Sequence, residues 1–186
     1  MTAWMAPRTG PAADIVTAIA KALPVLETER LVLRAPRVED WPVLEPIWTE
    51  DRAKYIGGPY NGEDAWLDFN GAVASWLLRG TGALTIALKD DDSPIGLVVL
   101  GAEHGDPEDE LGWLLIESAE GKGYATEAAT AMRDWALQTL GGGNFVSYVH
   151  DDNAASHNVA RKIGAIRDPR GHPLYDNCTV YRHGVQ

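Results

Sequence analysis

The segment Glu110–Gln138, ELGWLLIESAEGKGYATEAATAMRDWALQ, decides the fold of this chain. It opens with Glu110–Ile116, a short apolar run of strand length. A polar loop with two glycines follows. Then comes an alanine-rich stretch whose apolar residues recur every three or four positions, which is typical of an amphipathic helix. Three glycines, Gly141, Gly142 and Gly143, end it. The segment therefore predicts a strand, a glycine loop and a helix in direct succession.

The glycine loop is a candidate anion site. The first turn of a helix presents unpaired N–H groups and positive potential, and glycine lets an anion approach the backbone. A phosphate or pyrophosphate is the expected ligand, and Lys122 would add a charge. The alternative is an ordinary strand-to-helix turn without a ligand. Two known phosphate loops do not fit, because the chain lacks a Walker A string and has Thr126 at the third glycine position of the dinucleotide fingerprint.

The string Glu120–Ala125, EGKGYA, resembles the acyl-CoA pyrophosphate loop of the GNAT N-acetyltransferase superfamily, [Q/R]-x-x-G-x-[G/A]. Glu120 departs from that pattern, which removes a favourable contact near the phosphates. The longer string GKGYATEA resembles the Rim-type branch, the ribosomal-protein N-terminal acetyltransferases and their relatives. The resemblance implies an acetyl-CoA loop of Gly121, Lys122, Gly123, Tyr124, Ala125 and Thr126. It also implies a pantetheine arm lying along the strand, against backbone groups of Leu114, Leu115 and Ile116.

A second match lies in Asn153–Ala165, NAASHNVARKIGA, which resembles the helix start N-x-x-S and the helix end G-A of the superfamily. It implies that Asn153 hydrogen-bonds the pantetheine arm and that Ser156 lies near the sulfur. Helix capping is the alternative for Asn153, and the two roles are compatible. Many members carry a tyrosine as general acid where this chain has Ala160, so the hydroxyl of Ser156 is the expected donor to the thiolate.

Glu110 is the candidate general base. It opens the central strand in ELGWLL, which resembles the EIGYWL of Rim-type relatives. A carboxylate can accept the proton of an attacking amine directly or through water. A solvated carboxylate at a strand end is the alternative. The aromatic residues of the region before this strand either line the acceptor site or pack in the core: Trp48, Tyr55, Tyr60 and Trp66.

The charge of the chain bears on its partners. The net charge is −11, and lysine plus arginine total only 16 of 186 residues, so we expect no nucleic-acid partner. This acidity either attracts a cationic amine or serves solubility alone. Cys178 is the single cysteine, so no internal disulfide forms, in agreement with the cytoplasmic location that we expect.

Other functional classes find no support in the sequence. No apolar run has transmembrane length and no signal-peptide pattern is present, so no membrane partner is expected. The five histidines lack the spacing of metal ligands, so no metal is expected. No G-x-S-x-G string offers a hydrolase nucleophile.

The chain divides into an N-terminal extension, residues 1–25, with a short helix at 12–23 that packs on the domain, and one acetyltransferase domain, residues 26–186. Besides the central segment, the patterns predict helices at 39–48, 63–79 and 154–163 and strands at 29–35, 83–88, 95–100, 145–149, 165–167 and 175–182. Pro46 should kink or end the first of these helices, and residues 51–62 should form a loop. The strand at 29–35 should be half-buried, with its leucines on one side and Arg30, Val32 and Arg34 on the other. The resemblance implies an α/β (α+β) fold. Its mixed, mostly antiparallel central sheet would have helices on both faces and open between 110–116 and 145–149 to receive acetyl-CoA.

Together these features predict an N-acetyltransferase that moves an acetyl group from its co-substrate acetyl-CoA to a primary amine by direct attack. A non-catalytic acyl-CoA-binding or sensor domain on the same fold is the alternative, which Glu120 and Ala160 support. The acceptor stays open among a protein N-terminus, an aminoglycoside, a polyamine and another small amine. The sequence is compatible with both a monomer and a homodimer.

Overall fold

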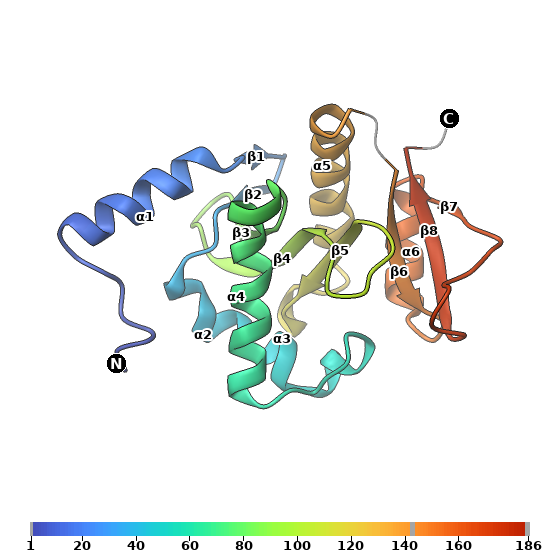
Figure 1. Cartoon of the computed structure of the whole chain (residues 1–186), viewed down its shortest axis with the longest axis horizontal. Coiled ribbons are helices and arrows are strands. Elements are labelled where there is room, and N and C mark those ends of the chain that lie inside the picture. Colours follow the sequence, from blue (N-terminus) through green and yellow to red (C-terminus); the bar gives the residue numbers. More distant parts are fainter. Residues whose placement is uncertain (1, 142–143, 185–186) are drawn as a thin grey trace.

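The computed structural model describes residues 2–141 and 144–184, so Gly142 and Gly143 of the predicted helix end lie outside the described residues. In the described residues, eight strands form one sheet in the order β1-β2-β3-β4-β5-β6-β8-β7 (Figure 1). Every neighbouring pair is antiparallel except β5 and β6. This confirms the predicted mixed, mostly antiparallel sheet. The strands are β1 (Leu26–Glu27), β2 (Leu31–Arg34), β3 (Ala83–Leu88), β4 (Pro94–Gly101), β5 (Glu110–Leu115), β6 (Phe145–His150), β7 (Ile166–Arg167) and β8 (Cys178–His183).

Helices cover both faces of the sheet (Figure 1). On one face α5 packs against β5, β4 and β2, and α6 packs against α5 and β6. On the other face α2 and α4 pack against β4, and α3 packs against both helices. The helices are α1 (Pro11–Ala22), α2 (Trp41–Leu44), α3 (Pro46–Thr49), α4 (Gly62–Arg79), α5 (Tyr124–Thr139) and α6 (Ala154–Lys162), with 3-10 turns η1 (Val38–Asp40), η2 (Asp51–Tyr55) and η3 (Glu117–Ala119).

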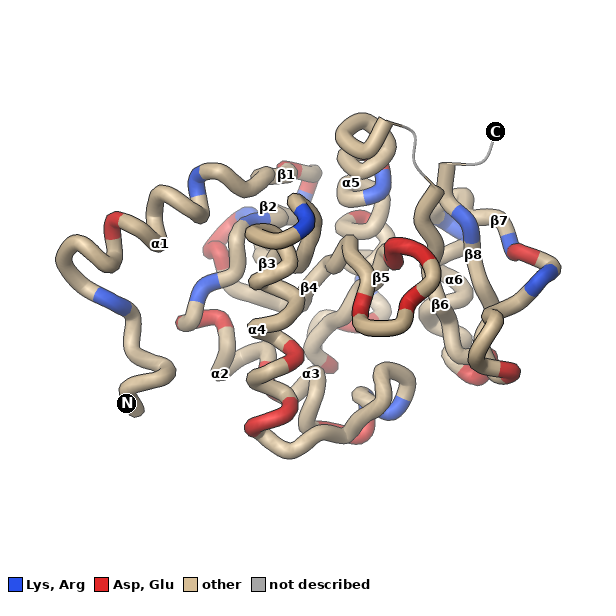
Figure 2. The backbone as a smooth tube through the Cα atoms, viewed as in Figure 1, with Lys and Arg blue, Asp and Glu red and all other residues tan. Residues whose placement is uncertain are grey.

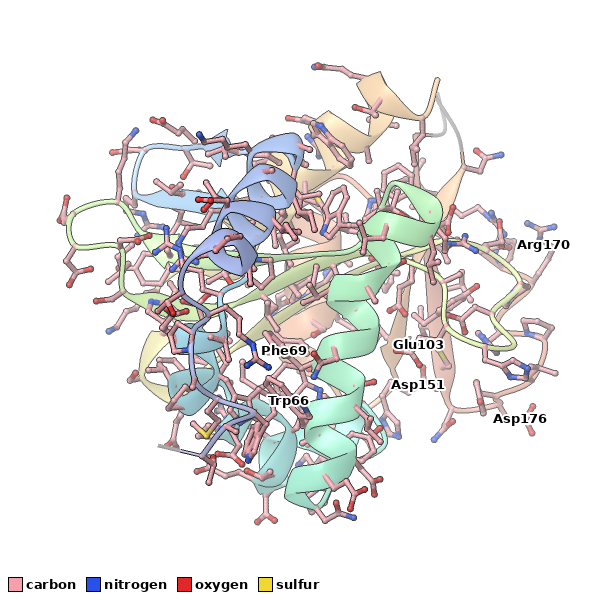
Figure 3. All side chains as sticks on the ribbon, turned by 60° about the vertical axis from the view of Figure 1, so that its left-hand side comes forward. Trp66, Phe69, Glu103, Asp151, Arg170 and Asp176 are labelled. Atoms are coloured by element: carbon pink, nitrogen blue, oxygen red, sulfur yellow. The ribbon has the colours of Figure 1, made fainter. Side chains whose placement is uncertain are left out.

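The alternation of β4 divides the core in two. Val98 and Leu100 belong to the apolar cluster under α5, whereas Leu97 and Val99, which alternate with them, pack in the cluster under α2 and α4. The second cluster is aromatic: Trp41 and Trp48 lie 5.6 Å apart between ring centroids. Trp66 and Phe69, on the side of α4 that faces the N-terminal segment in Figure 3, complete it. Both faces of the central strands are therefore buried.

The predicted helix at 39–48 is broken into η1, α2 and α3. Pro46 begins α3 as a new helix, because its ring fixes φ and its nitrogen cannot donate to the preceding turn. The predicted kink or end at Pro46 is confirmed. The segment after it was expected to be a loop throughout, but its first part is η2, a short helix that contains Arg52 and Tyr55.

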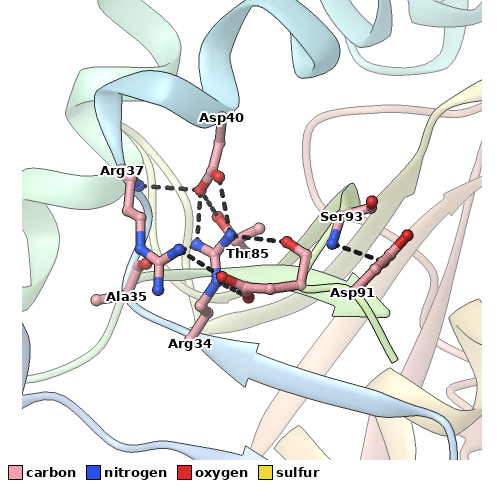
Figure 4. Close-up of polar contacts among 8 residues, drawn as sticks. Arg34, Ala35, Arg37, Asp40, Thr85, Asp91 and Ser93 are labelled. Atoms are coloured by element: carbon pink, nitrogen blue, oxygen red, sulfur yellow. Dashed lines mark hydrogen bonds and ion pairs between the residues drawn. The ribbon is translucent and has the colours of Figure 1, made fainter. Parts of the chain in front are cut away.

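Arg34 is a correction to the predicted half-buried strand, which placed it on the polar side. The residue is buried, with 6% of its surface exposed. Its guanidinium binds both carboxylate oxygens of Asp40, at 2.8 and 2.9 Å, and one oxygen of Asp92 at 2.6 Å (Figure 4). Thr85 also donates to Asp40. This network ties β2 to η1 and to the β3–β4 hairpin. The positive charge of Arg34 can be buried because the carboxylates of Asp40 and Asp92 pair with it.

The N-terminal helix forms as predicted, but it does not pack on the domain through its apolar face. Ile15 and Val16 are 63% and 59% exposed, and α1 has no buried residue. In Figure 1 it lies along one edge of the molecule, beyond β1 and β2. The segment contacts the domain on either side of α1 instead: Leu23 packs against the cluster under α5, and Met5 packs against the cluster under α2 and α4.

Candidate functional site

The sheet opens between β5 and β6. These parallel strands are paired at a single position, Glu110 opposite Val146, and the Val146 N–H donates to the Asp109 carbonyl at 2.9 Å. On its other side β5 pairs with β4 along its whole length. The strands therefore diverge beyond their first residues, as the resemblance implied. The opening begins at Glu110 and widens toward the end of β5.

Backbone groups of β5 line one side of this opening. The Ile116 N–H donates to the Ile95 carbonyl at 3.0 Å, and paired positions alternate along an antiparallel ladder. Leu114 and Ile116 therefore turn their backbone groups toward β4. Those of Trp113 and Leu115 point into the opening. Of the three residues predicted to meet pantetheine, Leu115 is the one whose N–H and carbonyl face this space.

Ser147 and His183 hold the two strands together where the opening begins. The Ser147 hydroxyl donates to the Leu111 carbonyl at 2.6 Å, so it accepts from Nε2 of His183 at 2.9 Å. Burial, with a contribution from Arg133, lowers the pKa of His183 to about 4. The imidazole is therefore neutral at physiological pH. The Ser147 hydroxyl on β6 thus gives the Leu111 carbonyl the hydrogen bond that a backbone N–H would give if the β5–β6 pairing continued.

The carboxylate of Glu110 lies in the notch where β5 and β6 separate. Its Oε1 accepts a hydrogen bond from the Tyr148 backbone N–H at 3.3 Å, in place of a β5 carbonyl. Burial raises the pKa of Glu110 to about 8; the carboxylates of Asp106 and Glu103 add to this, and the Tyr148 N–H opposes it. A group with this pKa exchanges protons near neutral pH, as a general base requires.

Further acidic side chains extend from Glu110 toward α4. Burial and the carboxylates of Asp68 and Asp106 raise the pKa of Glu103. Burial, Asp68 and Glu103 likewise raise the pKa of Tyr60. Figure 2 shows the acidic positions on the β4–β5 loop and on α4. We call Asp68, Glu103, Asp106 and Glu110 the acidic wall. Its negative potential favours a cationic ligand at this end of the opening.

Two ion pairs fix the chain immediately before Glu110. Arg182 on β8 binds Glu108 through two hydrogen bonds of 2.7 and 2.8 Å. Arg79 at the end of α4 binds Asp109 at 2.6 Å. The first pair lowers the pKa of Glu108 by hydrogen bonding. The β4–β5 loop is therefore anchored from both sides, which positions the strand that carries Glu110.

The glycine loop lies at the other end of β5. Gly121 and Gly123 have φ angles of 71° and 84°, in the left-handed region that favours glycine, and Gly123 directly precedes α5. Arg30, directly before β2, fixes the loop: it donates to the Lys122 carbonyl at 3.0 Å and to Glu127 in the first turn of α5 at 2.7 Å. Its guanidinium lies 4.5 Å from the ring centroid of Tyr124.

These features fit the pyrophosphate of an acyl-CoA. The first turn of α5, which contains Tyr124, Ala125 and Thr126, presents helical N–H groups at the loop. A Cβ atom added at Gly121 would meet no atom within 4 Å, so the backbone there is open to a ligand. A groove of about 590 Å³ continues from Gly123 along α5 and is lined by Glu27, Thr28, Gly123, Thr126, Glu127, Thr130, Ala131, Asp134 and Lys162.

Asn153 and Ser156 lie at the start of α6, across the opening from β5. The Asn153 side-chain oxygen accepts from the Ser156 N–H at 3.1 Å, so the capping prediction is confirmed. Gly164 follows the helix with a φ of 77°, as expected of a residue that ends it. The roles of Asn153 toward pantetheine and of the Ser156 hydroxyl toward the sulfur stay predictions.

The four aromatic candidates separate into two groups. Trp48 is 1% exposed, and Trp66 packs on Trp41, so both belong to the aromatic core. Tyr55 lies at the opening instead: its hydroxyl donates to the Asp152 carbonyl at 3.2 Å and its ring packs on His150. Tyr60 lies beside the acidic wall and donates to the Ile56 carbonyl at 2.6 Å.

Two site residues were not singled out from the sequence. Tyr148 presents its N–H to Glu110, a contact that depends on where the two strands separate. Arg52 donates to the Leu115 carbonyl and to Glu120 from a segment expected to be a loop. The departure of Glu120 from the loop pattern was the one sequence feature that could have pointed to Arg52. An acidic residue beside a phosphate site repels the phosphates unless a cation neutralises it.

Within residues 2–141 and 144–184, no cluster of three His, Cys, Asp or Glu side chains is arranged to hold a metal ion. Of the helices described in these ranges, none has the length and apolar character needed to cross a membrane.

Comparison with known proteins places these features in context. Residues 30–166 match the acetyltransferase (GNAT) domain family. An acetyltransferase from Agrobacterium tumefaciens is 41% identical, superposes with a TM-score of 0.82, and is matched over 94% of its chain and 87% of this one. The uncharacterized N-acetyltransferase YnaD of Bacillus subtilis is 27% identical over 81% of this chain and 92% of its own.

The fold is also that of a ribosomal-protein acetyltransferase. The structure from Salmonella typhimurium, described as modifying the N-terminal serine of a 50S ribosomal subunit protein, has a TM-score of 0.69 at 18% identity and covers 88% of this chain and 100% of its own.

Proposed function

The chain belongs to the GNAT acetyltransferase family, and we propose that it transfers the acetyl group of acetyl-CoA to a primary amine with Glu110 as the general base. One observation carries the proposal. The Glu110 carboxylate, with a pKa of about 8, lies in the notch where β5 and β6 separate. The opening that begins there leads along β5 to the glycine loop at the start of α5.

The chemistry assigns a task to each end of the opening. An aliphatic or α-amino group must lose a proton before it can attack, and Glu110 accepts that proton directly or through water. A β5 N–H that faces the opening, at Trp113 or Leu115, stabilises the negative charge on the carbonyl oxygen. The hydroxyl of Ser156 supplies a hydrogen bond to the departing thiolate. The glycine loop holds the pyrophosphate and thereby sets the position of the thioester.

The acidic wall supports an acceptor with positive charge beyond the reacting amine. The negative charges of Asp106 and Glu103 raise the pKa of Glu110, and that of Asp68 raises the pKa of Glu103, so the same charges attract a protonated amine as it approaches. A peptide N-terminus with a basic neighbour and a small polyamine both meet this description. The fold shared with a ribosomal-protein acetyltransferase adds weight to the peptide.

A non-catalytic sensor for acyl-CoA is the second candidate. Ala160 stands where many members have the acid tyrosine, and Arg52 already occupies the Leu115 carbonyl, one of the groups that the pantetheine arm would use. A sensor would bind acetyl-CoA without turning it over.

The test is thiol release from acetyl-CoA with a panel of acceptors: peptides with basic or acidic second residues, polyamines and aminoglycosides. Mass spectrometry of each product should show one added acetyl group on an amine. We expect turnover to be faster with cationic acceptors than with acidic ones. Tight binding of acetyl-CoA without turnover on any acceptor would favour the sensor, and absence of binding at millimolar acetyl-CoA would overturn the proposal.

A further inference from the structure

The short helix η2 connects the two sides of the sheet opening. At one end Arg52 donates from Nη1 to the Leu115 carbonyl on β5, at 2.6 Å. At the other end the hydroxyl of Tyr55 donates to the Asp152 carbonyl, between β6 and α6, at 3.2 Å. Figure 1 shows the segment after α3 passing below the end of β5 toward β6. Because it is held on both sides, η2 keeps the backbone of Arg52 at the mouth of the opening.

The guanidinium of Arg52 reaches the glycine loop. Its Nη2 lies 2.9 Å from Oε1 of Glu120, the residue directly before Gly121. The side chain of Arg52 is 15% exposed, whereas that of Glu120 is 58% exposed. The arginine is therefore the enclosed and fixed member of the pair. It is also the basic member of a hollow otherwise lined by Glu50, Asp51 and Glu117, so phosphates arriving there would meet repulsion without it.

We propose that Arg52 binds the pyrophosphate of acetyl-CoA and so performs the task of the Gln or Arg that position 120 lacks. This inference rests on the proposed function, since it takes acetyl-CoA to bind at the glycine loop. Arginine has five N–H donors in a rigid fork, and in the described part of the chain two of them make hydrogen bonds, to Leu115 and Glu120. The Nε atom of Arg52 also lies 3.9 Å from a carboxylate oxygen of Glu50, too far for a hydrogen bond. The remaining donors can bind phosphate oxygens with charge assistance.

Glu120 then has a positive role in the site, although it departs from the loop pattern. Its carboxylate holds the guanidinium beside Gly121, and the pair is neutral overall. The opposing view is that Arg52 only cancels the charge of Glu120 and never touches the phosphates. The two views differ in what Arg52 contributes once Glu120 has lost its charge.

A double-mutant cycle separates the two views, with the variants Arg52→Gln, Glu120→Gln and the double substitution. Calorimetry would measure the Kd of each variant for acetyl-CoA and for S-acetyl-pantetheine, which lacks the pyrophosphate. Direct contact predicts that Arg52→Gln weakens acetyl-CoA binding about 10–100-fold in wild type, and still about 10-fold in the Glu120→Gln background. Binding of S-acetyl-pantetheine should change less than threefold. Lys54→Gln is the control, because Lys54 lies two residues after Arg52 in η2 and its replacement removes the same charge. This variant should leave both Kd values unchanged.

Two results would overturn the inference while the proposed function stands. One is an Arg52→Gln variant that binds acetyl-CoA normally once Glu120 is Gln. The other is an equal loss for both ligands, which would place the effect on the groove rather than on the phosphates. Thermal melting of the free variants checks folding, and Arg52→Lys, which keeps the charge, should recover part of the affinity. If wild type itself fails to bind acetyl-CoA, the proposed function and this inference both fall.

Discussion

Replacing Glu110 by Gln should stabilise the protein at alkaline pH while it removes the proposed base. Burial raises the pKa of Glu110 from an ordinary 4.5 to about 8. Between these values the folded protein holds a proton that the unfolded chain releases, so the free energy of unfolding falls as pH rises. Above pH 8 the carboxylate in the notch is ionised, and its desolvation lowers the free energy of unfolding by the full amount. Gln keeps the acceptor for the Tyr148 N–H but cannot ionise.

The gap between the two pKa values sets the magnitude. At about 1.4 kcal/mol per pKa unit it corresponds to an upper limit of about 5 kcal/mol. Glu110 as a whole residue is only half-buried, so we expect Glu110→Gln to gain about 1–3 kcal/mol over wild type at pH 8.5. Below pH 4.5 the two proteins should differ by less than about 0.5 kcal/mol.

Urea unfolding of both proteins at pH 4.5, 6.5 and 8.5 measures this difference directly. Glu117→Gln, which removes an exposed carboxyl from η3 at the other end of the opening, is the matched control and should follow wild type. Parallel pH dependence of wild type and Glu110→Gln would refute the reasoning, because it would mean that Glu110 ionises as an ordinary solvated carboxyl.

Three other substitutions test separate parts of the site and fold. Gly123→Asp puts a charged side chain on left-handed backbone at the start of α5, so acetyl-CoA binding should weaken at least about 10-fold by calorimetry; an unchanged Kd would show that the loop is an ordinary turn. Ser156→Ala should lower turnover on acetyl-CoA and an amine at every pH tested, and full activity would remove its hydroxyl from the mechanism. Arg34→Met leaves Asp40, which is 3% exposed, without its charged partner and should cost about 3–5 kcal/mol in urea unfolding; a loss below about 1 kcal/mol would contradict a buried ion pair.

Local patterns predicted most of the elements because each carries its own signal. The apolar run from Glu110, the glycines and the periodic alanines predicted β5, the loop and α5, and all three form. Pro46 predicted the break before α3, and α3 begins at this residue. Where a residue depends on distant partners, the prediction was wrong or absent. Arg34 was assigned to the polar side of its strand, because its partners Asp40 and Asp92 come from other elements.

The candidate site shows the same limit. The identity of Glu110 as a candidate base could be read from the sequence, but its raised pKa depends on the point where β5 and β6 separate and on the neighbours Asp106 and Glu103. Arg52 carries no motif of its own. It reaches Glu120 across 68 positions of sequence, and only the fold brings the two together. Long-range contacts of this kind complete the site, whereas the motifs mark where it lies.

The most direct test of the central claim is the pH dependence of kcat/KM for the acceptor, compared between wild type and Glu110→Gln. The acceptor amine should have a known pKa, so that its own ionisation can be divided out. The account predicts that the corrected wild-type value rises with pH to a plateau with an apparent pKa of about 8, as Glu110 ionises. It predicts a Glu110→Gln value about 10²–10⁴-fold below that plateau, without this rise. A variant within twofold of wild type, with the same profile, would contradict the account.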